Sequence, residues 1–417
     1  MNVHDSEKMY GVLRRIGYGR VESVHSADLV IFNTCSIRQK AEQKFYSELG
    51  KLKSLKKRRP DLKIAVAGCV AQQDGHALFK RAPHVDFIIG PQNIHAIAHL
   101  EEWPTPYAVL DDNPSLALND LPAARNEELK AWVTIMYGCD NFCSYCVVPY
   151  TRGRERSRPS DNILREVSHL SENGCREITL LGQNVNSYAS DVDFAGLLRK
   201  VHAVSGIKRI RFVTSHPKDF SEDLMRTIAD LPKVCEHVHL PLQSGSDAIL
   251  KRMKRRYSLS DYRKKIDTLR RYIPSIAITS DIMTGFPGET DNDHMKTIQA
   301  LKDIRFDGIF AFAFSARPQT AAARYPEHVS DDTKLERLKA ILETQDEITL
   351  AKNNELIGSI QEILVEGPVD TKDGCLMGRT RTNKIVTIQS DGVERGQIVD
   401  VKIVHARKHS LEGTLTS

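Results

Sequence analysis

Three cysteines close together in the sequence are the residues best suited to chemistry. Cys139, Cys143 and Cys146 form a C-x3-C-x2-C set within Tyr137–Cys146, directly after the apolar run Trp132–Met136. Cysteine thiolates are the usual ligands of iron–sulfur clusters, so three at this spacing can bind three irons of a four-iron cube. The fourth iron is then left without a protein ligand, and an open position is what separates a catalytic metal site from a structural one.

A zinc site and a chance grouping of thiols stay open as alternatives from the residues alone. A structural zinc site needs four ligands, usually as two separated pairs. No second pair follows here, and the nearest downstream histidine is His169. Three unrelated buried thiols would require chance clustering in a chain with only eight cysteines. The spacing therefore favours a cluster over zinc, and zinc over chance.

The residues around these cysteines resemble the radical S-adenosylmethionine (radical SAM) superfamily. An aromatic residue, Tyr145, precedes the last cysteine, and the stretches Val147–Gly153 and Ser157–Pro159 are similar to the methylthiotransferases that modify tRNA. The resemblance covers essentially the whole chain. It implies that the open iron binds S-adenosylmethionine, and that reduction of the cluster then releases a 5′-deoxyadenosyl radical.

Two further cysteines follow short apolar runs near the start of the chain. Leu29–Phe32 and Ile64–Ala67 are typical of strands buried on both faces of a parallel sheet, and Cys35 and Cys69 come just after them. Ligands gather at the carboxyl ends of such strands, although a single cysteine is more often a small buried hydrophobe. The resemblance implies that both are ligands of an auxiliary four-iron cluster, which carries the sulfur to be methylated by a second S-adenosylmethionine.

The third ligand of that auxiliary cluster is missing from the sequence. In the family it lies at the end of a first strand, within Gly-Cys-Gln-Met-Asn, and the chain begins at Met1-Asn2. The missing cysteine would lie two positions before the first residue. We expect the true start to lie upstream, since Cys35 and Cys69 are retained. If the protein starts here, the auxiliary cluster has two protein ligands and the sheet lacks a strand.

The cysteines must be positioned by an α/β fold with three domains. Residues 1–110 predict a small parallel α/β domain without its first strand, and residues 111–128 predict a linker. Residues 129–356 predict a partial (β/α)6 radical SAM barrel. The expected helices of the first domain cover residues 6–16 and about 38–58, and its third strand covers 85–89. The expected barrel strands lie near Val133, Ile178, Ile210, Val238, Ile278 and Ile309, with helices including 162–171, 261–271 and 291–303.

Polar and glycine-rich clusters follow the six barrel strands, where such barrels place their chemistry. By resemblance, these clusters hold S-adenosylmethionine, and the predicted cofactor-binding residues are Gly182, Gln183, Asn184, Ser215, Gln243, Asp281, Gly285, Pro287 and Gly288. His216 is expected to be a hydrogen-bonded structural histidine. No catalytic acid or base is assigned. Gln319 stands where the family has glycine, which removes φ freedom and predicts a different turn after strand six.

A helix over about 331–356 leads to a small β-barrel at residues 357–417. Its expected strands cover 360–365, 385–388 and 398–404, with turns at Gly367, 373–374 and 391–392. By resemblance this is a TRAM domain, an RNA-binding barrel. Cations among hydroxyls suit phosphates and sugars. RNA contacts are therefore predicted beside the cluster and in the stretch 378–384, by Arg152, Arg158, Arg379, Arg381 and Lys384.

Composition limits which classes of protein and which cellular compartments fit this chain. The chain is 41% hydrophobic and 27% charged, an ordinary soluble composition, and its net charge of +5 is too small to prove a polyanionic partner. The N-terminus has no apolar signal core, and no long uncharged run could span a membrane. We expect a cytoplasmic protein without a membrane partner. In that reducing compartment cysteines serve metals or catalysis rather than disulfides.

The sequence thus predicts a tRNA methylthiotransferase, by what the resemblance implies. The expected reaction adds a methylthio group to C2 of N6-isopentenyladenosine next to the anticodon. The expected cofactors are two 4Fe-4S clusters and S-adenosylmethionine, and the expected partners are the tRNA anticodon stem-loop and an electron donor such as flavodoxin or ferredoxin. We expect a monomer. The alternatives are a branch that acts on threonylcarbamoyladenosine or on a ribosomal protein, and a non-catalytic iron–sulfur protein that binds RNA.

Overall fold

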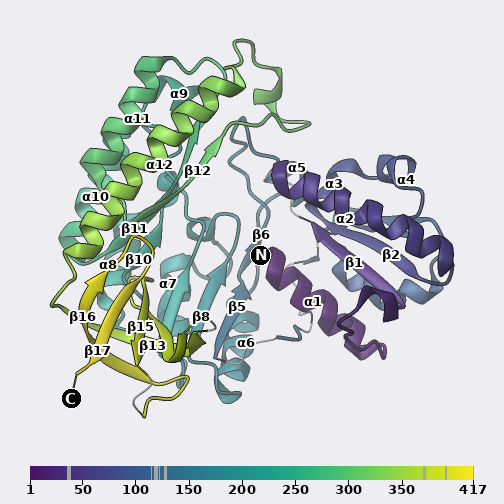
Figure 1. The fold of residues 1–417 in the computed structure, drawn as a ribbon, viewed down its shortest axis with the longest axis horizontal. Helices are drawn as coiled ribbons and strands as arrows, with labels where there is room; N and C mark the ends of the chain where they lie inside the picture. The colour runs from purple at the N-terminus through teal and green to yellow at the C-terminus, as the bar shows by residue number, and fades with distance from the viewer. Residues whose placement is uncertain are drawn as a thin grey trace. The chain divides into compact units, whose positions relative to one another are not determined.

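The computed structural model describes residues 1–34, 39–113, 115–116, 121, 123–125, 129–369, 372–389 and 392–416 (Figure 1). The chain divides into two compact units. Unit 1 comprises Met1–Glu127, Met136–Asn162 and Ser315–Ala323, and unit 2 comprises Glu128–Ile135, Ile163–Phe314 and Arg324–Ser417. The segment with Cys139, Cys143 and Cys146 therefore belongs to the same unit as the N-terminal sheet.

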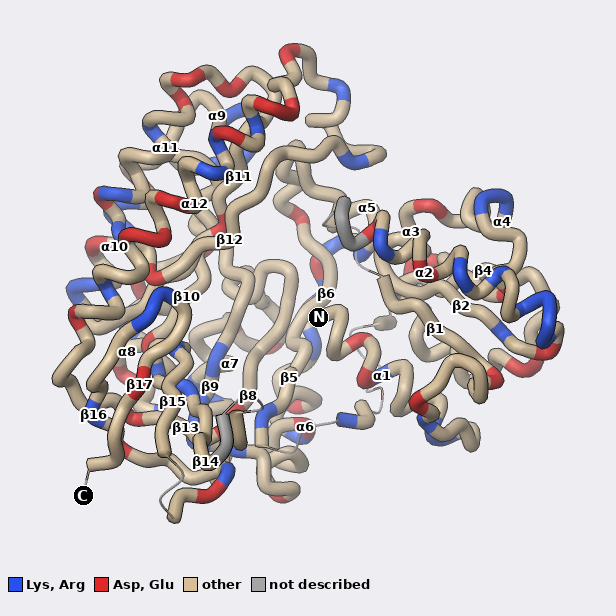
Figure 2. The backbone as a smooth tube through the Cα atoms, viewed as in Figure 1, with Lys and Arg blue, Asp and Glu red and all other residues tan. Residues whose placement is uncertain are grey.

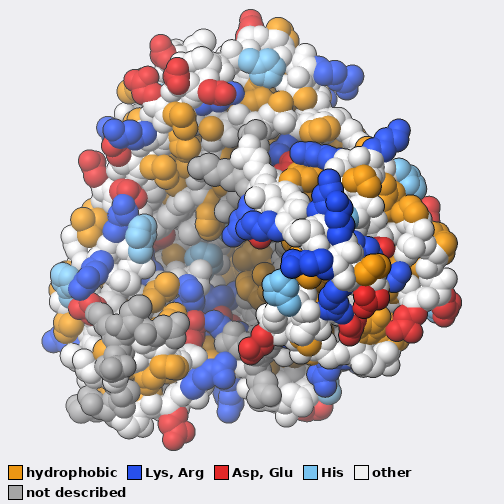
Figure 3. Space-filling view, turned by 45° about the vertical axis from the view of Figure 1, so that its right-hand side comes forward, with side chains coloured by type: hydrophobic (Ala, Val, Ile, Leu, Met, Phe, Trp, Pro, Cys, Tyr) orange, Lys and Arg blue, Asp and Glu red, His pale blue; other side chains and the backbone are white. Residues whose placement is uncertain are grey.

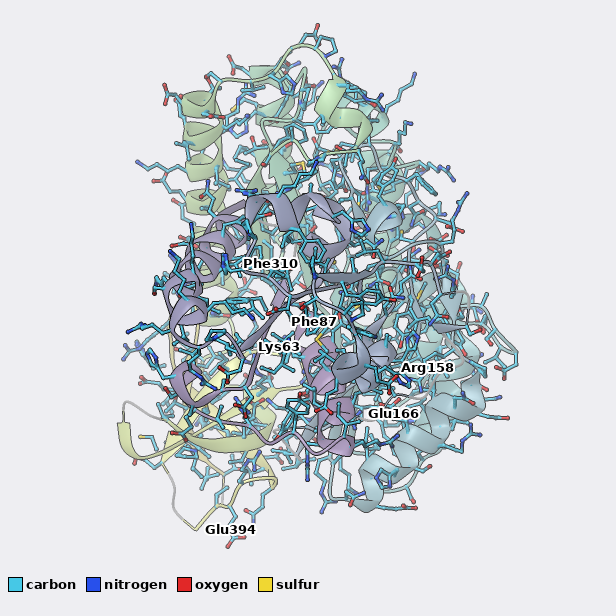
Figure 4. The ribbon with its side chains drawn as sticks, turned by 90° about the vertical axis from the view of Figure 1, so that its right-hand side faces the viewer. Lys63, Phe87, Arg158, Glu166, Phe310 and Glu394 are labelled. Carbon is cyan, nitrogen blue, oxygen red and sulfur yellow. The ribbon has the colours of Figure 1, made fainter. Side chains whose placement is uncertain are left out.

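Unit 1 is built on a four-stranded parallel sheet in the order β1 (Leu29–Thr34), β2 (Lys63–Gly68), β3 (Phe87–Ile89) and β4 (Tyr107–Val109). Figure 4 labels Lys63 and Phe87, the first residues of β2 and β3. The predicted parallel sheet and its three expected strands are confirmed. The short strand β4 was not predicted, because three residues are too few to produce a periodic signal.

Alternate residues of β2 face two apolar layers, as the two-residue period of a strand requires. Ile64 and Val66 pack against α2 (Gln39–Arg58), whereas Ala65 and Ala67 pack against α1 (Asn2–Arg15). Helix α1 starts four residues before the expected start at Ser6. Its first turns carry buried polar side chains, which give no apolar periodicity. The remaining helices of this sheet domain are η1 (Val24–Ser26), α3 (Cys69–Asp74), α4 (Ala77–Arg81) and η2 (Ile94–Glu102).

The cysteine-bearing part of unit 1 is framed by a short antiparallel pair. Strand β6 (Met136–Tyr137) pairs with β7 (Arg156–Ser157), and α5 (Val148–Thr151) lies between them in the sequence. The two strands bring together the start and the end of the segment that contains all three cysteines. Helix α5 packs against α3, which begins at Cys69.

Unit 2 contains the six predicted parallel strands. Their bounds are β5 (Lys130–Thr134), β8 (Glu177–Leu181), β9 (Arg209–Phe212), β10 (His237–His239), β11 (Ala277–Thr284) and β12 (Gly308–Ala313). They form two parallel sheets, β5-β8-β9 and β10-β11-β12. A hydrogen bond from Ser215 N–H to the His239 carbonyl (3.4 Å) connects β9 to β10. This arrangement confirms the partial barrel.

Helices lie between and after the barrel strands in the chain. They are α6 (Ser160–Glu172), α7 (Phe194–His202), α8 (Glu222–Asp230), α9 (Asp247–Arg252), α10 (Leu259–Tyr272), α11 (Asp291–Ile304) and α12 (Asp331–Asn354). Lys and Arg alternate with Asp and Glu along α10, α11 and α12 (Figure 2). In the described part of the chain, every helix is too short or too polar to cross a membrane.

The C-terminal part of unit 2 is a closed five-stranded barrel. Its strands are β13 (Ile360–Val369), β14 (Lys372–Thr380), β15 (Ile385–Gln389), β16 (Ile398–Ala406) and β17 (Leu411–Leu415), in the order β13-β14-β15-β17-β16. The predicted barrel is confirmed, but β14 and β17 were not expected, because glycines and polar residues obscure their alternation. The expected turn at Gly367 is wrong: this residue lies inside β13, next to a register shift.

Candidate functional site

The loop with the three cysteines folds back on itself in unit 1. Cys139 N–H donates to the Gly153 carbonyl (3.2 Å), which closes the loop, and Cys146 N–H donates to the Cys143 carbonyl (3.0 Å). Gly138 has a φ of +75°, and a Cβ added there would lie 1.9 Å from the Arg154 carbonyl oxygen. Only glycine combines this φ with such a close approach. The backbone therefore determines which residue precedes the first cysteine.

The three thiols of the loop are ligands of the kind that iron–sulfur clusters use. Cys143 is buried, and Cys139 and Cys146 are half-buried. Asn141 Nδ2 donates to Cys139 Sγ (3.4 Å). In the described part of the chain, no three His, Cys, Asp or Glu side chains are gathered closely enough to hold one metal ion. In a cube each thiolate binds a separate iron, and thiolates are the soft ligands that suit such clusters.

Burial raises the pKa of the Cys139 thiol, and hydrogen bonds from Asn141 act in the opposite direction. Because a thiolate rather than a thiol is the metal ligand, a donor aimed at this sulfur is useful. A bound iron would supply the positive charge that offsets the remaining cost of burying the Cys139 thiolate.

Helix α1 contacts both flanks of the cysteine loop inside unit 1. Lys8 Nζ donates to the Tyr137 hydroxyl (2.9 Å), two residues before the first cysteine. Arg152 Nη2 donates to Asp5 Oδ2 (2.6 Å), six residues after the last cysteine. All four side chains are buried. Sequence analysis missed Asp5 and Lys8, since nothing near them in the chain marks them as partners of this loop.

Arg152 and Arg158, for which RNA contacts were predicted, are both buried, with exposed fractions of 8% and 3%; Figure 4 labels Arg158. Burial acts to lower the pKa of Arg152, but Asp5 and Cys69 raise it above its ordinary value. Its guanidinium is therefore charged and faces protein groups. An RNA contact of Arg152 stays a prediction, and it would require the pair with Asp5 to open.

Cys69 lies at the carboxyl end of β2, as expected, and is buried. Thr34, the last residue of β1, is paired with Gly68. A Cβ on Gly68 would lie 2.4 Å from the Thr34 carbonyl oxygen, so the two strand ends approach closely. Cys35 itself lies outside the described residues. The fit to an auxiliary cluster therefore rests on Cys69, a buried thiol that contributes to raising the pKa of the Arg152 guanidinium.

In unit 2, the loops after β8 and β9 carry buried polar atoms that have no hydrogen-bond partner among the described residues. Asn184 Nδ2 donates to Asp219 Oδ2 (2.8 Å), but Asn184 Oδ1 has no hydrogen-bond partner among the described residues. The same holds for Ser215 Oγ and His216 Nε2. Buried polar groups are almost always satisfied in native proteins. These three atoms are thus suited to a polar ligand such as S-adenosylmethionine, and Gly182 and Gln183 lie in the same loop as Asn184.

His216 is neutral and fixed by backbone groups. The ring Nδ1 of His216 accepts a hydrogen bond from the backbone N–H of Lys218 (3.1 Å). The backbone N–H of His216 donates to Asn186 Oδ1 (2.8 Å). Burial, together with the nearby Arg255 and Lys218, lowers the pKa of His216 to about 2. This confirms the expectation of a hydrogen-bonded structural histidine.

The structure brings Gln243, in an isolated bridge after β10, next to Asp281 of β11. Gln243 N–H donates to the Asp281 carbonyl (2.8 Å), and Met283 N–H donates to the Gln243 carbonyl (2.8 Å). Gln243 has a φ of +73°, so its backbone is held in the left-handed region. Asp281 Oδ1 lies 3.5 Å from His239 Nε2. Two predicted cofactor-binding residues are thus adjacent at one end of the barrel.

Gly285 and Gly288 have positive φ angles of +68° and +81°. A Cβ would lie 2.3 Å from Lys334 Cγ at Gly285 and 2.7 Å from Arg252 Cζ at Gly288. These contacts explain both glycines by packing alone, with Pro287 buried between them. Their predicted contact with S-adenosylmethionine therefore stays a prediction.

Gln319 keeps a left-handed backbone conformation although it lacks the φ freedom of glycine, and the different turn expected here stays a prediction. Gln319 has a φ of +69°, the conformation that glycine adopts most easily. Thr320 Oγ1 donates to the Arg317 carbonyl (2.8 Å), and Arg317 Nη1 pairs with Glu42 Oε2 (3.1 Å) in the same unit. Ala322 N–H also donates to the Ser144 carbonyl (2.7 Å) in the cysteine loop. Local contacts therefore hold the turn despite the side chain.

The three predicted RNA-binding cations of the C-terminal barrel have partners within unit 2. Arg379 Nε lies 3.2 Å from Glu366 Oε1, and Arg381 donates to both carboxylate oxygens of Glu236 (2.7 Å each). Lys384 Nζ lies 3.4 Å from Asp307 Oδ1 and donates to Asn353 Oδ1 (2.8 Å). Arg381 and Lys384 therefore attach the small barrel to the rest of the unit. Their predicted contact with RNA stays a prediction.

Two buried arginines on β9 were missed by sequence analysis. Arg209 is fully buried, lies 2.8 Å from Glu362 Oε1 and donates to the Arg379 carbonyl (2.6 Å). Arg211 pairs with Glu177 (3.0 Å) and donates to the carbonyls of Thr380 and Arg381 (2.8 Å each). Two arginines at positions i and i+2 of an apolar strand share one face. That pattern was the signal in the sequence that could have identified them.

Comparison with known proteins agrees with this arrangement. Three sequence models match: the uncharacterized protein family UPF0004 at residues 1–90, the radical SAM superfamily at 133–301 and the TRAM domain at 354–416. A protein of Thermodesulfovibrio yellowstonii named tRNA-2-methylthio-N(6)-dimethylallyladenosine synthase is 55% identical over 100% of this chain and 96% of its own length. One of the same name from Acetivibrio thermocellus is 46% identical, over 100% and 88%.

Solved structures of low identity show the same fold. The radical S-adenosylmethionine methyltransferase TsrM from Kitasatospora setae has a TM-score of 0.58 at 14% identity, over 77% of this chain and 72% of that one. The cobalamin-dependent S-adenosylmethionine radical enzyme OxsB has a TM-score of 0.55 at 12% identity, over 83% and 53%. With a relative 55% identical along its whole length, this chain belongs to the family of tRNA-2-methylthio-N(6)-dimethylallyladenosine synthases among the radical SAM methylthiotransferases.

Proposed function

We propose that this protein adds a methylthio group to C2 of N6-isopentenyladenosine next to the anticodon of tRNA. The observation that carries the proposal is a single closed loop with Cys139, Cys143 and Cys146, in a chain that matches the named tRNA-modifying synthases over its full length. We assign one role to each of three domains. Residues 1–110 bind the auxiliary cluster, residues 129–356 carry out the radical chemistry, and residues 357–417 bind RNA. Residues 111–128 are the linker.

The three loop thiolates hold three irons of a four-iron cluster and leave one iron for S-adenosylmethionine. When bound, the cluster supplies the electron that cleaves the sulfonium of S-adenosylmethionine. The chain's own residues hold the ligands in place. Asn141 stabilises the Cys139 thiolate through its hydrogen bond, and Gly138 permits the backbone crossing that closes the loop.

The loops of the barrel hold S-adenosylmethionine. Asn184 Oδ1, Ser215 Oγ and His216 Nε2 are buried polar atoms that the described protein leaves unsatisfied, and the amino and ribose groups of the cofactor can satisfy them. His216 binds as a neutral ring and transfers no proton. Gln183, Gln243 and Asp281 complete the polar lining, and Gly182, Gly285, Pro287 and Gly288 shape its backbone.

Cys35 and Cys69 hold the auxiliary cluster that carries the sulfur. Cys69 contributes a buried thiol at the end of a parallel strand, the position at which open sheets bind ligands. The charged Arg152 beside it stabilises the thiolate that ligation needs.

The RNA partner is the tRNA anticodon stem-loop. The match to the TRAM domain supports an RNA-binding C-terminal barrel. Lys and Arg side chains also gather on the face of unit 1 shown in Figure 3, and α2 exposes Lys51, Lys53, Lys57 and Arg58. Such cations bind phosphates without reading sequence. Arg158, Arg379, Arg381 and Lys384 are proposed to exchange protein partners for phosphates when tRNA binds.

The proposed reaction also requires a reductant and a suitable cellular compartment. A flavodoxin or ferredoxin is proposed as the electron donor, because the cluster must be reduced before each cleavage of S-adenosylmethionine. The protein is proposed to act as a monomer in the cytoplasm, where tRNA and reduced thiols are both found.

The test is nucleoside analysis by mass spectrometry. Total tRNA is taken from a strain that lacks the gene and from the same strain carrying this chain or its Cys139→Ala variant. We expect 2-methylthio-N6-isopentenyladenosine with the chain. N6-isopentenyladenosine should accumulate without the chain and with the variant, because a cluster that lacks one of its three ligands does not support S-adenosylmethionine cleavage.

The matched control is Cys375→Ala, which removes a half-buried thiol of β14 outside both cluster sites. It should leave the methylthiolated nucleoside at the parental level. A methylthio group found instead on threonylcarbamoyladenosine would reassign the substrate. An unchanged nucleoside profile together with no 5′-deoxyadenosine from the purified protein would reject the enzyme.

A further inference from the structure

The sheet β10-β11-β12 in unit 2 has one face covered by helices and one face that carries an exposed aromatic side chain. Helices α10, α11 and α12 lie along one side of these strands (Figure 1). The Tyr262 hydroxyl of α10 and Ser280 Oγ of β11 both donate to the Leu240 carbonyl (2.7 and 3.1 Å), so Ser280 points toward the helices. Because strand side chains alternate, Asp281 points to the opposite face, which is the inner face of the partial barrel.

Asp281 and its neighbours form a well-defined cluster on this inner face. Asp281 is paired in register with Phe310 of β12, and its Oδ1 lies 3.5 Å from His239 Nε2. His239 Nδ1 lies 3.1 Å from Thr279 Oγ1. The rings of His239 and Phe310 form a T-shaped pair with centroids 5.8 Å apart. Phe310 is therefore oriented by a histidine that Thr279 and Asp281 hold in place.

Phe310 is 54% exposed, although it lies inside a β-strand (Figure 4). The next pair along the ladder, Met283 with Phe312, lies on the same face and is also partly exposed. Apolar side chains that are exposed together beside polar groups are typical of ligand-binding sites. A methionine also adapts its shape to an apolar ligand. Phe310, Phe312 and Met283 thus form an apolar wall on the inner face.

The charge beside the apolar wall limits the kind of ligand that it suits. The residue in register with Phe310 is Asp281, an acid whose side chain is 29% exposed. Like charges brought together across an interface cost binding free energy, so an anionic group is disfavoured here. The wall is therefore suited to an uncharged alkyl group. N6-isopentenyladenosine carries such a group, a branched hydrocarbon chain, whereas the threonylcarbamoyl group of the alternative substrate ends in a carboxylate.

We propose that Phe310, together with Met283 and Phe312, contacts the N6-isopentenyl group of the target adenosine and determines the preference for this group over polar N6 substituents. The inference rests on the proposed function, in which Asp281 belongs to the lining for S-adenosylmethionine. A radical formed from the cofactor reacts only with atoms held close to it, so the substrate base must lie beside that lining. The apolar wall lies at this position, because Phe310 is in register with Asp281.

The experiment compares synthetic anticodon stem-loop RNAs that differ only at the target adenosine, which carries an isopentenyl group, a threonylcarbamoyl group or no substituent. The full chain is reconstituted anaerobically and kept without reductant, so that no turnover occurs, and fluorescence anisotropy gives the Kd for each RNA. Phe310→Ala removes the ring, and Phe310→Leu keeps an apolar side chain. Because the ring is exposed, its loss leaves no buried cavity of the kind that destabilises a fold. Circular dichroism checks the folding of each variant.

We expect the parent chain to bind the isopentenylated RNA about tenfold more tightly than the unmodified RNA, because the wall removes the alkyl group from water. Phe310→Ala should reduce this preference to about twofold or less, and Phe310→Leu should keep most of it. The threonylcarbamoylated RNA should bind no more tightly than the unmodified RNA. The matched control is Leu342→Ala on α12, which removes an apolar side chain that is 42% exposed and lies outside the inner face. It should keep the parental preference.

An unchanged preference in Phe310→Ala would overturn the inference. An equal loss of affinity for all of the RNAs would also overturn it, because Phe310 would then not distinguish the N6 substituent. An unchanged preference with a raised KM for S-adenosylmethionine, measured by release of 5′-deoxyadenosine, would assign the wall to the cofactor instead. Nucleoside analysis with the parent chain separates these failures from failure of the proposed function. If the parent forms 2-methylthio-N6-isopentenyladenosine and Phe310→Ala keeps the preference, only the inference is rejected.

Discussion

Gln319 is the residue at which local preference and the observed conformation disagree most clearly. A non-glycine residue in the left-handed region costs about 1–2 kcal/mol, and Gln319 has a φ of +69°. The turn persists because Arg317 and Thr320 on either side are held by hydrogen bonds. Strain maintained by surrounding contacts is typical of functional sites, and this turn contacts the cysteine loop through Ala322 and Ser144.

We predict that Gln319→Gly raises the free energy of unfolding by about 1 kcal/mol, because relief of the positive φ outweighs the greater freedom of glycine in the unfolded chain. Urea unfolding measures the change. Gln299→Gly is the control, since Gln299 lies inside α11; there glycine should lower stability by about 1 kcal/mol. A loss of stability in both variants would show that the turn is not strained.

At the scale of elements, the strand pair β6–β7 joins the two ends of the cysteine loop. The two strands pair through Met136 with Ser157 and Tyr137 with Arg156. Gly138 follows β6 and passes against the backbone of Arg154, so the two ends of the loop are in direct backbone contact. Apolar periodicity cannot reveal such a pair of two-residue strands, because two residues cover a single strand period and show no repeat.

Gly138→Ala should therefore displace the loop and abolish most iron binding. The added Cβ meets a backbone oxygen at 1.9 Å, which no rotamer change can relieve. Iron per chain after anaerobic reconstitution is the measurement. Gly174→Ala is the matched control: it also has a positive φ, +87°, but has no atom within 4 Å of the added Cβ. It should keep its iron and lose only about 1 kcal/mol of stability. Equal iron in both variants would contradict the argument.

At the scale of the whole molecule, the small C-terminal barrel of unit 2 is attached through charged groups that lie far apart in the sequence. Arg209 of β9 reaches Glu362 of β13 and the carbonyl of Arg379, and Arg381 reaches Glu236. Buried ion pairs of this kind contribute little net stability compared with apolar packing, but removal of one partner is strongly destabilising. They determine where the barrel attaches rather than whether it folds.

Arg209→Met is expected to lower the free energy of unfolding by about 3 kcal/mol. This is the low end of the usual range, because Glu362 is 38% exposed and can be partly rehydrated. Urea unfolding gives the value, and limited proteolysis should show faster cleavage between α12 and β13. Arg226→Met removes an exposed pair with Glu222 and should change stability by less than about 1 kcal/mol. Similar losses of stability in both variants would contradict the conclusion that Arg209 attaches the barrel.

The sequence by itself determined the parts that depend on short stretches of chain. Apolar runs of four to six residues marked the buried parallel strands, and helical periodicity marked the long helices, because both patterns repeat within a few residues. The spacing of Cys139, Cys143 and Cys146 identified the cluster loop for the same reason. The weak points were β4, which is too short for a period to develop, and β14 and β17, in which glycines and polar residues obscure the alternation.

Only the tertiary structure decided which distant side chains surround the site. Asp5 and Arg152 are 147 residues apart, and Lys8 and Tyr137 are 129 apart. The sequence assigned Arg152 to RNA because it lies beside the cluster, at the rim that tRNA must reach. Folding buries it and pairs its guanidinium with Asp5. A buried charge is tolerated only where a partner is brought to it, and that partner is chosen by the packing of α1, α3 and α5, which no local pattern encodes.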